Sequence, residues 1–87
     1  MNHSITAIIA DDEATIRNGL EKIITNSKLN IRVLGTADNG KDALSLIIQY
    51  NPDIAIMDIN MPELFGLEVI RKIRETKMNT YFFILSG

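Results

Sequence analysis

The sequence contains no cysteine, one histidine and only two prolines. Without cysteine, neither a disulfide framework nor a thiolate metal site can form. No apolar run is long enough to span a membrane, and residues 1–4 do not form the basic start of a secretion signal. These absences favour a cytoplasmic protein that makes no contact with the membrane.

The chain also lacks an excess of charge of either sign. Nine basic and eleven acidic residues give a formal net charge of -2, with a pI of about 5.2. Because the Lys and Arg residues are scattered along the sequence, there is no electrostatic reason for this chain to bind nucleic acid. With 87 residues, of which 46% are hydrophobic, it is long enough for one small domain.

Short apolar runs alternate with segments of helical periodicity. The runs predict strands at 5–10, 31–34, 54–57 and 81–85, and apolar residues spaced by three or four positions predict a helix in each interval. A βαβαβαβ order with short connections predicts a doubly wound parallel sheet with helices on both sides. This is an α/β fold.

Several details of these elements follow from local signals. Asp12 and Asn39 are the predicted N-caps of the first and second helices. The unbroken apolar run 54–57 predicts a strand that is buried on both faces. Leu67 is expected in the apolar stripe of the third helix, together with Ile70.

Polar side chains follow three of the predicted strands. Asp11 and Asp12 follow the first, Asp58 the third and Ser86 the fourth. Because the carboxyl ends of parallel strands meet at one edge, these side chains are expected to converge there. Three close carboxylates would repel one another without a cation, and an all-oxygen donor set suits Mg²⁺. Asp58 could then attack a phosphorus centre, with the Ser86 hydroxyl donating to a phosphoryl oxygen.

Each of these residues also has an ordinary structural explanation. Asp11 and Asp12 could simply be acids favoured at a helix N-terminus, and Asp58 could form an Asx-turn. A hydroxyl such as that of Ser86 is common at a strand end. Their joint placement at corresponding strand ends favours a functional site.

Four motifs run through the chain in order: I-I-A-D-D-E at 8–13, A-D-N-G-K-D-A-L at 37–44, P-D-I-A-I-M-D-I-N-M-P-E-L-F-G-L-E-V-I at 52–70, and F-I-L-S-G at 83–87. In these motifs and their spacing the sequence resembles the receiver domain of two-component response regulators. The resemblance implies a flavodoxin-like fold. It also implies a switch, controlled by phosphorylation and used in transcription, rather than an enzyme.

The resemblance also assigns roles to residues. Asp58 would be the phosphoacceptor, taking a phosphoryl group from a histidine of a sensor kinase or phosphotransfer protein. Asp12 and Asp58 would contact Mg²⁺ directly, Asp11 would help through water, and Asn60 would contribute its main-chain carbonyl. Ser86 fills the family's hydroxyl position.

The sequence departs from the family pattern at its end. A receiver has five strand-helix units, so residues 1–87 are expected to be a receiver domain that lacks the fourth helix, the fifth strand with its lysine, and the fifth helix. Strand 81–85 would then have an unpaired edge and an apolar patch around Phe82 or Phe83. Such an edge favours pairing with another chain, which predicts a homo-oligomer. A smaller departure is Phe65, where many relatives carry Asp or Asn.

Two other functions fit parts of the sequence. A Mg²⁺-dependent phosphatase of the haloacid dehalogenase type would also use an aspartyl intermediate, but it needs a second acid where this chain has Asn60. An interaction module independent of phosphorylation would leave the acid triad unexplained.

Overall fold

A computed structural model of the protein describes residues 4–85, and strands and helices alternate along this part of the chain. The elements are β1 Ile5–Ala10, α1 Ala14–Asn26, β2 Ile31–Ala37, α2 Gly40–Tyr50, β3 Ile54–Asp58, α3 Gly66–Arg74 and β4 Tyr81–Leu85. The predicted order of elements is therefore confirmed.

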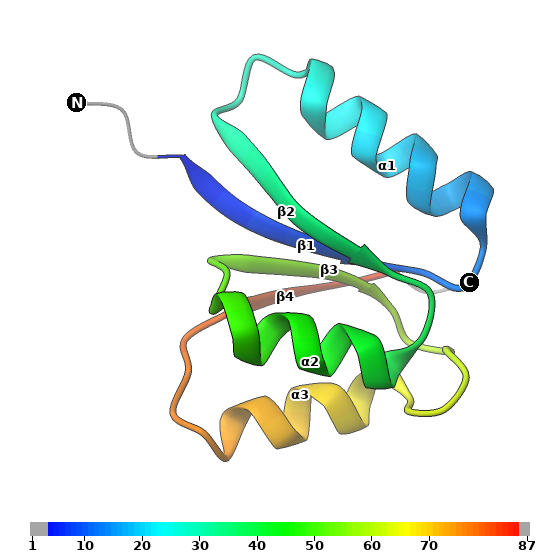
Figure 1. The fold of residues 1–87 in the computed structure, drawn as a ribbon, viewed down its shortest axis with the longest axis vertical. Coiled ribbons are helices and arrows are strands. Elements are labelled where there is room, and N and C mark those ends of the chain that lie inside the picture. Colours follow the sequence, from blue (N-terminus) through cyan, green and yellow to red (C-terminus); the bar gives the residue numbers. More distant parts are fainter. Residues whose placement is uncertain (1–3, 86–87) are drawn as a thin grey trace.

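The four strands form one parallel sheet in the order β2-β1-β3-β4. Helix α1 covers one face, whereas α2 and α3 lie side by side on the other face (Figure 1). This is the predicted doubly wound fold. All four strands point the same way, so their carboxyl ends share one edge of the sheet.

The main core lies between the sheet and the α2–α3 layer. Alternate strand residues point into it, because successive side chains of a strand face opposite sides. Fully buried members include Ile8 of β1, Met57 of β3, Ile47 of α2 and Ile73 of α3. Phe82 packs against the same cluster, and the Arg74 guanidinium lies 5.3 Å from its ring centroid.

The opposite face of the sheet is less well covered, and the prediction that β3 is buried on both faces is wrong. Ala55 and Met57 are fully buried, whereas Ile54 and Ile56 are only half-buried. The reason is that α1 packs on β1 and β2. Phe83, the register partner of Ile56, is 57% exposed on this open side.

The ends and faces of the helices test the other local predictions. Asn39 caps α2 as predicted, since its Oδ1 accepts the Asp42 N–H at 2.8 Å. The buried residues of α3 are Gly66, Val69 and Ile73, whereas Leu67 is 61% exposed. Leu67 therefore lies outside the apolar stripe. Strand β2 also runs past the predicted end, as far as Ala37.

Candidate functional site

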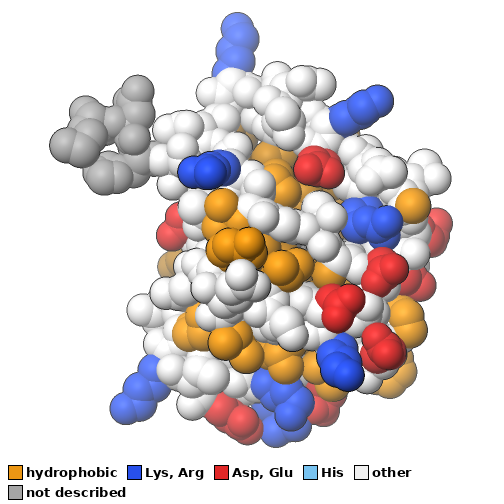
Figure 2. Space-filling model, viewed as in Figure 1, with side chains coloured by type: hydrophobic (Ala, Val, Ile, Leu, Met, Phe, Trp, Pro, Cys, Tyr) orange, Lys and Arg blue, Asp and Glu red, His pale blue; other side chains and the backbone are white. Residues whose placement is uncertain are grey.

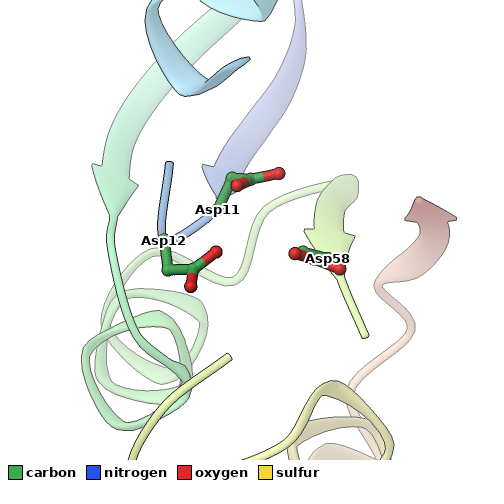
Figure 3. A group of neighbouring side chains, drawn as sticks. All are labelled: Asp11, Asp12 and Asp58. Atoms are coloured by element: carbon green, nitrogen blue, oxygen red, sulfur yellow. The ribbon is translucent and has the colours of Figure 1, made fainter. Parts of the chain in front are cut away.

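The three predicted acids converge at the carboxyl edge of the sheet. Asp11 and Asp12 follow β1, and Asp58 is the last residue of β3, which pairs directly with β1. One carboxylate oxygen from each of the three lies within 4.8 Å of the others, around a common space (Figure 3). Several acidic side chains, with Lys and Arg among them, lie on the side of the molecule toward which the strands point (Figure 2).

Asp11 is the most firmly held of the three and is only 2% exposed. Its N–H donates to the carbonyl of Ala37 at 3.0 Å, and its Oδ1 accepts the Glu13 N–H at 2.9 Å. Its own carbonyl accepts a hydrogen bond from Arg17 Nη1 at 2.8 Å. The side chain and both main-chain polar groups of Asp11 are therefore fixed.

Asp12 does not act as the N-cap of α1, so that prediction is wrong. The helix begins at Ala14, its N-cap residue is Glu13, and no side-chain hydrogen bond caps it at that residue. Asp11 Oδ1 accepts the N–H of this N-cap residue, Glu13. The carboxylate of Asp12 is exposed and joins the acid cluster.

Asp58 is half-buried and does form an Asx-turn, with Oδ1 accepting the Asn60 N–H at 3.2 Å. The ordinary explanation of this residue is thus correct for one oxygen. Within residues 4–85, Oδ2 of Asp58 accepts no hydrogen bond, so the turn leaves one oxygen for other chemistry.

The loop that follows Asp58 is anchored at both ends. The Gly66 N–H donates to the carbonyl of Ile59 at 3.0 Å, and the Gly40 N–H donates to that of Pro62 at 3.2 Å. Met61, 1% exposed, anchors the loop in the core. Asn60 is exposed, and no described residue donates to its carbonyl. This carbonyl oxygen therefore has no hydrogen-bond partner within residues 4–85.

The remaining predicted residue, Ser86, lies outside the described residues. Sequence reasoning also missed two contributors, Arg17 and Gly40. The periodicity of the first helix places Arg17 on its polar side, and Asn39-Gly40 indicates a turn. Many other residues are accepted at the first position of a helix. The glycine at position 40 was therefore the one sequence signal that this position has a special role.

The donor set determines which ions this cluster suits. Asp11, Asp12 and Asp58 offer only carboxylate oxygens, which are the ligands that hard cations such as Mg²⁺ prefer. The Asn60 carbonyl, without a hydrogen-bond donor among the described residues, is a further oxygen two positions after Asp58. The residues present therefore fit a divalent cation of this class.

A parallel, doubly wound sheet that gathers acids at its carboxyl edge defines a flavodoxin-like α/β domain. The model of the response regulator receiver domain matches residues 7–87, and the chain belongs to this family.

Relatives and solved structures agree with this assignment. The chain is 44% identical over 80 residues to the transcriptional regulatory protein YdfI of Bacillus subtilis, covering 91% of this chain and 36% of YdfI. Among solved structures, the receiver domain of NarL from Mycobacterium tuberculosis superposes with a TM-score of 0.93 at 29% identity, covering 98% of this chain and 68% of that one. A CheX–CheY–BeF3–Mg²⁺ complex from Borrelia burgdorferi matches with a TM-score of 0.85 at 26% identity, covering 94% of this chain and 61% of that one.

The first three curated relatives are longer proteins, of which this chain spans 33%, 22% and 36%. The expectation of a receiver that is incomplete at its C-terminus stays a prediction.

None of the helices among residues 4–85 is long and apolar enough to cross a membrane.

Proposed function

We propose that Asp58 accepts a phosphoryl group from a histidine of a sensor kinase or phosphotransfer protein, and that this modification switches a regulator of transcription. The observation that carries the proposal is the convergence of Asp11, Asp12 and Asp58 within 4.8 Å, with one Asp58 oxygen unused by the Asx-turn. The similarity to YdfI, a transcriptional regulatory protein, supports the proposed control of transcription.

In the proposed reaction, a carboxylate oxygen of Asp58 attacks the phosphorus of a phosphohistidine. The P–N bond breaks, and its electron pair stays on the imidazole nitrogen, which takes up a proton from solvent. The product is an aspartyl phosphate. The Ser86 hydroxyl donates to a phosphoryl oxygen in this proposal.

Asp12, Asp58 and the Asn60 carbonyl are the proposed direct ligands of Mg²⁺, and Asp11 would act through a bound water. When bound, Mg²⁺ supplies positive charge that offsets the carboxylates and the phosphoryl oxygens. The similar CheY of Borrelia burgdorferi was solved in a complex with BeF3 and Mg²⁺, which supports this choice of ion.

The experiment is labelling with phosphoramidate, whose P–N bond resembles that of phosphohistidine, in the presence of Mg²⁺. Intact-mass analysis and peptide mapping should place one phosphoryl group on Asp58, and Asp58→Asn should remain unlabelled. Asp53→Asn is the matched control, because Asp53 directly precedes β3, at the end of the strand away from Asp58, and its Oδ2 accepts hydrogen bonds from Thr6. Undiminished labelling of Asp58→Asn would refute the proposal. Steady release of phosphate from unrelated phosphomonoesters would favour the phosphatase instead.

We also propose that copies of this chain associate through β4. This strand pairs only with β3, so its outer backbone edge is open among the described residues. On the side away from the α2–α3 core, Tyr81 is 73% exposed and Phe83 is 57% exposed. The patch centres on Phe83, because Phe82 packs against the core. An open edge beside exposed aromatic rings is a template for pairing with another chain.

Sedimentation over a wide concentration range tests the association. The wild-type chain should form dimers or higher oligomers, and Phe83→Lys should shift it toward the monomer. Ile48→Lys is the control, since Ile48 is similarly exposed, at 55%, but lies on α2. A wild-type chain that stays monomeric throughout and unfolds cooperatively would show that β4 needs no partner.

The expected cytoplasmic location, the absence of DNA contact and the absence of enzyme activity stay predictions.

A further inference from the structure

Helix α1 has few anchors on the sheet. None of its residues is fully buried, and the helix has no side-chain hydrogen bond from its N-cap residue. Its half-buried residues include Arg17, which lies in the first turns of the helix. The guanidinium of Arg17 reaches back toward the sheet, and Nη1 donates to the carbonyl of Asp11 at 2.8 Å.

This hydrogen bond is made at Asp11, the first residue after β1. Among the described residues, Arg17 is the only donor to the Asp11 carbonyl. The carbonyl belongs to the peptide that joins Asp11 to Asp12. The orientation of this peptide therefore helps to set the direction in which the Asp12 carboxylate leaves the main chain.

We propose that Arg17 is a positioning residue for the metal pocket: its guanidinium holds the Asp11–Asp12 peptide so that both carboxylates face Asp58. This inference rests on the proposed function, because it assumes that the three carboxylates bind Mg²⁺. Groups that hold metal ligands in place commonly change metal affinity by about 10- to 100-fold when they are removed.

A purely electrostatic role for Arg17 predicts the opposite result. A cation near the pocket repels Mg²⁺, so removing the guanidinium would strengthen Mg²⁺ binding. If the guanidinium positions the ligands, removing it weakens binding instead. The sign of the change therefore separates the two roles.

The surroundings of Arg17 allow this test without unfolding the protein. The guanidinium borders a cavity of about 240 Å³, which is also lined by Thr36, Asp38 and Asp42. Because the lining is polar, water can fill the space left by a shorter or uncharged side chain. Arg17→Met keeps the apolar stem of the side chain and removes only the charged donor group.

The experiment compares the Mg²⁺ affinities of wild type, Arg17→Met and Arg17→Lys by following amide resonances during titration with MgCl₂. Arg17→Met should bind Mg²⁺ about tenfold more weakly, at the low end of the range for outer ligand contacts. Arg17→Lys should recover part of this loss, because an ammonium group can still donate to the Asp11 carbonyl. Each of the three proteins should still unfold in a cooperative urea transition, which shows that the Mg²⁺ affinities are those of folded protein.

Arg32→Met is the matched control, since Arg32 is exposed on β2 and its side chain makes no hydrogen bond or ion pair within the described chain. It should leave the Mg²⁺ affinity unchanged. The inference is overturned if Arg17→Met binds Mg²⁺ as tightly as wild type or more tightly, or if Arg17→Lys is no better than Arg17→Met. A folded wild-type protein that shows no Mg²⁺-dependent shifts would instead overturn the proposed function, and this inference with it.

Discussion

The close contact between α2 and the loop after Asp58 makes Gly40→Ala a demanding test of the structure. A Cβ added at Gly40 would overlap the carbonyl oxygen of Leu64 and lie 2.6 Å from its carbonyl carbon. Ordinary contacts of a Cβ begin at 3.4 Å, so the loop backbone must move. The hydrogen bond from the Gly40 N–H to the Pro62 carbonyl would be strained or lost.

The expected loss of stability combines three effects. Overpacking costs about 1 to 3 kcal/mol and the loss of one hydrogen bond about 1 kcal/mol, whereas replacing glycine by alanine in a helix returns up to about 1 kcal/mol. The net loss is about 2 to 4 kcal/mol when the helical gain is small at this first position. An 87-residue domain has a free energy of unfolding of about 4 to 13 kcal/mol. Gly40→Ala should therefore remove a large fraction of it.

Urea unfolding at a fixed protein concentration measures this loss, and Gly19→Ala is the matched control. Gly19 lies within α1, and a Cβ there would meet nothing within 4 Å. The same chemical change should therefore raise stability at Gly19 by about 0.5 to 1 kcal/mol and lower it at Gly40. A Gly40→Ala protein as stable as wild type would refute the described packing of α2 against the loop.

Two further substitutions test smaller features. Asn39→Ala removes the side-chain oxygen that accepts the Asp42 N–H at 2.8 Å and caps α2. It should lower the free energy of unfolding by about 1 to 2 kcal/mol in urea titrations. An unchanged free energy of unfolding would show that the cap does not stabilise the protein. The hydrogen bond from Arg71 holds the pKa of Glu68 below its ordinary value of 4.5. The Glu68–Arg71 pair therefore stabilises the folded protein above pH 4.5, and this stabilisation is lost as the pH falls through the lowered pKa. The urea midpoints of wild type and Glu68→Gln should therefore differ at pH 7, and converge in acid and in high salt, because the pair is exposed; a difference independent of pH would contradict this assignment.

The fold and the acid edge were predictable because their signals are local. Four apolar runs and the helical spacing between them specify the alternation of elements, and parallel strands bring Asp11, Asp12 and Asp58 to one edge without any knowledge of side-chain contacts. The cap at Asn39 was predictable for the same reason, since a cap depends on residues three positions apart.

The errors concern competition between partners and contacts between distant segments. Asp12 has the chemistry of an N-cap, but the helix begins one residue later, with Glu13 as its N-cap residue, and the Asp12 carboxylate lies in the acid cluster. The half-exposed side of β3 depends on where α1 lies along the sheet, which periodicity does not specify. Gly40 packs closely against Leu64, which lies far along the sequence, and no local motif predicts a contact between residues so far apart.

Titration of the folded protein with Mg²⁺, followed by backbone amide resonances, tests the central claim most directly. The amides of Asp11, Asp12, Asp58 and Asn60 should shift and saturate together, because they surround the proposed metal pocket. The resonance of the Asp53 amide, which directly precedes β3 and lies away from the acid cluster, should not shift. Asp58→Asn should bind more weakly, since it removes one negative ligand. A folded sample whose resonances at the acid edge stay unmoved would contradict the assignment of this site.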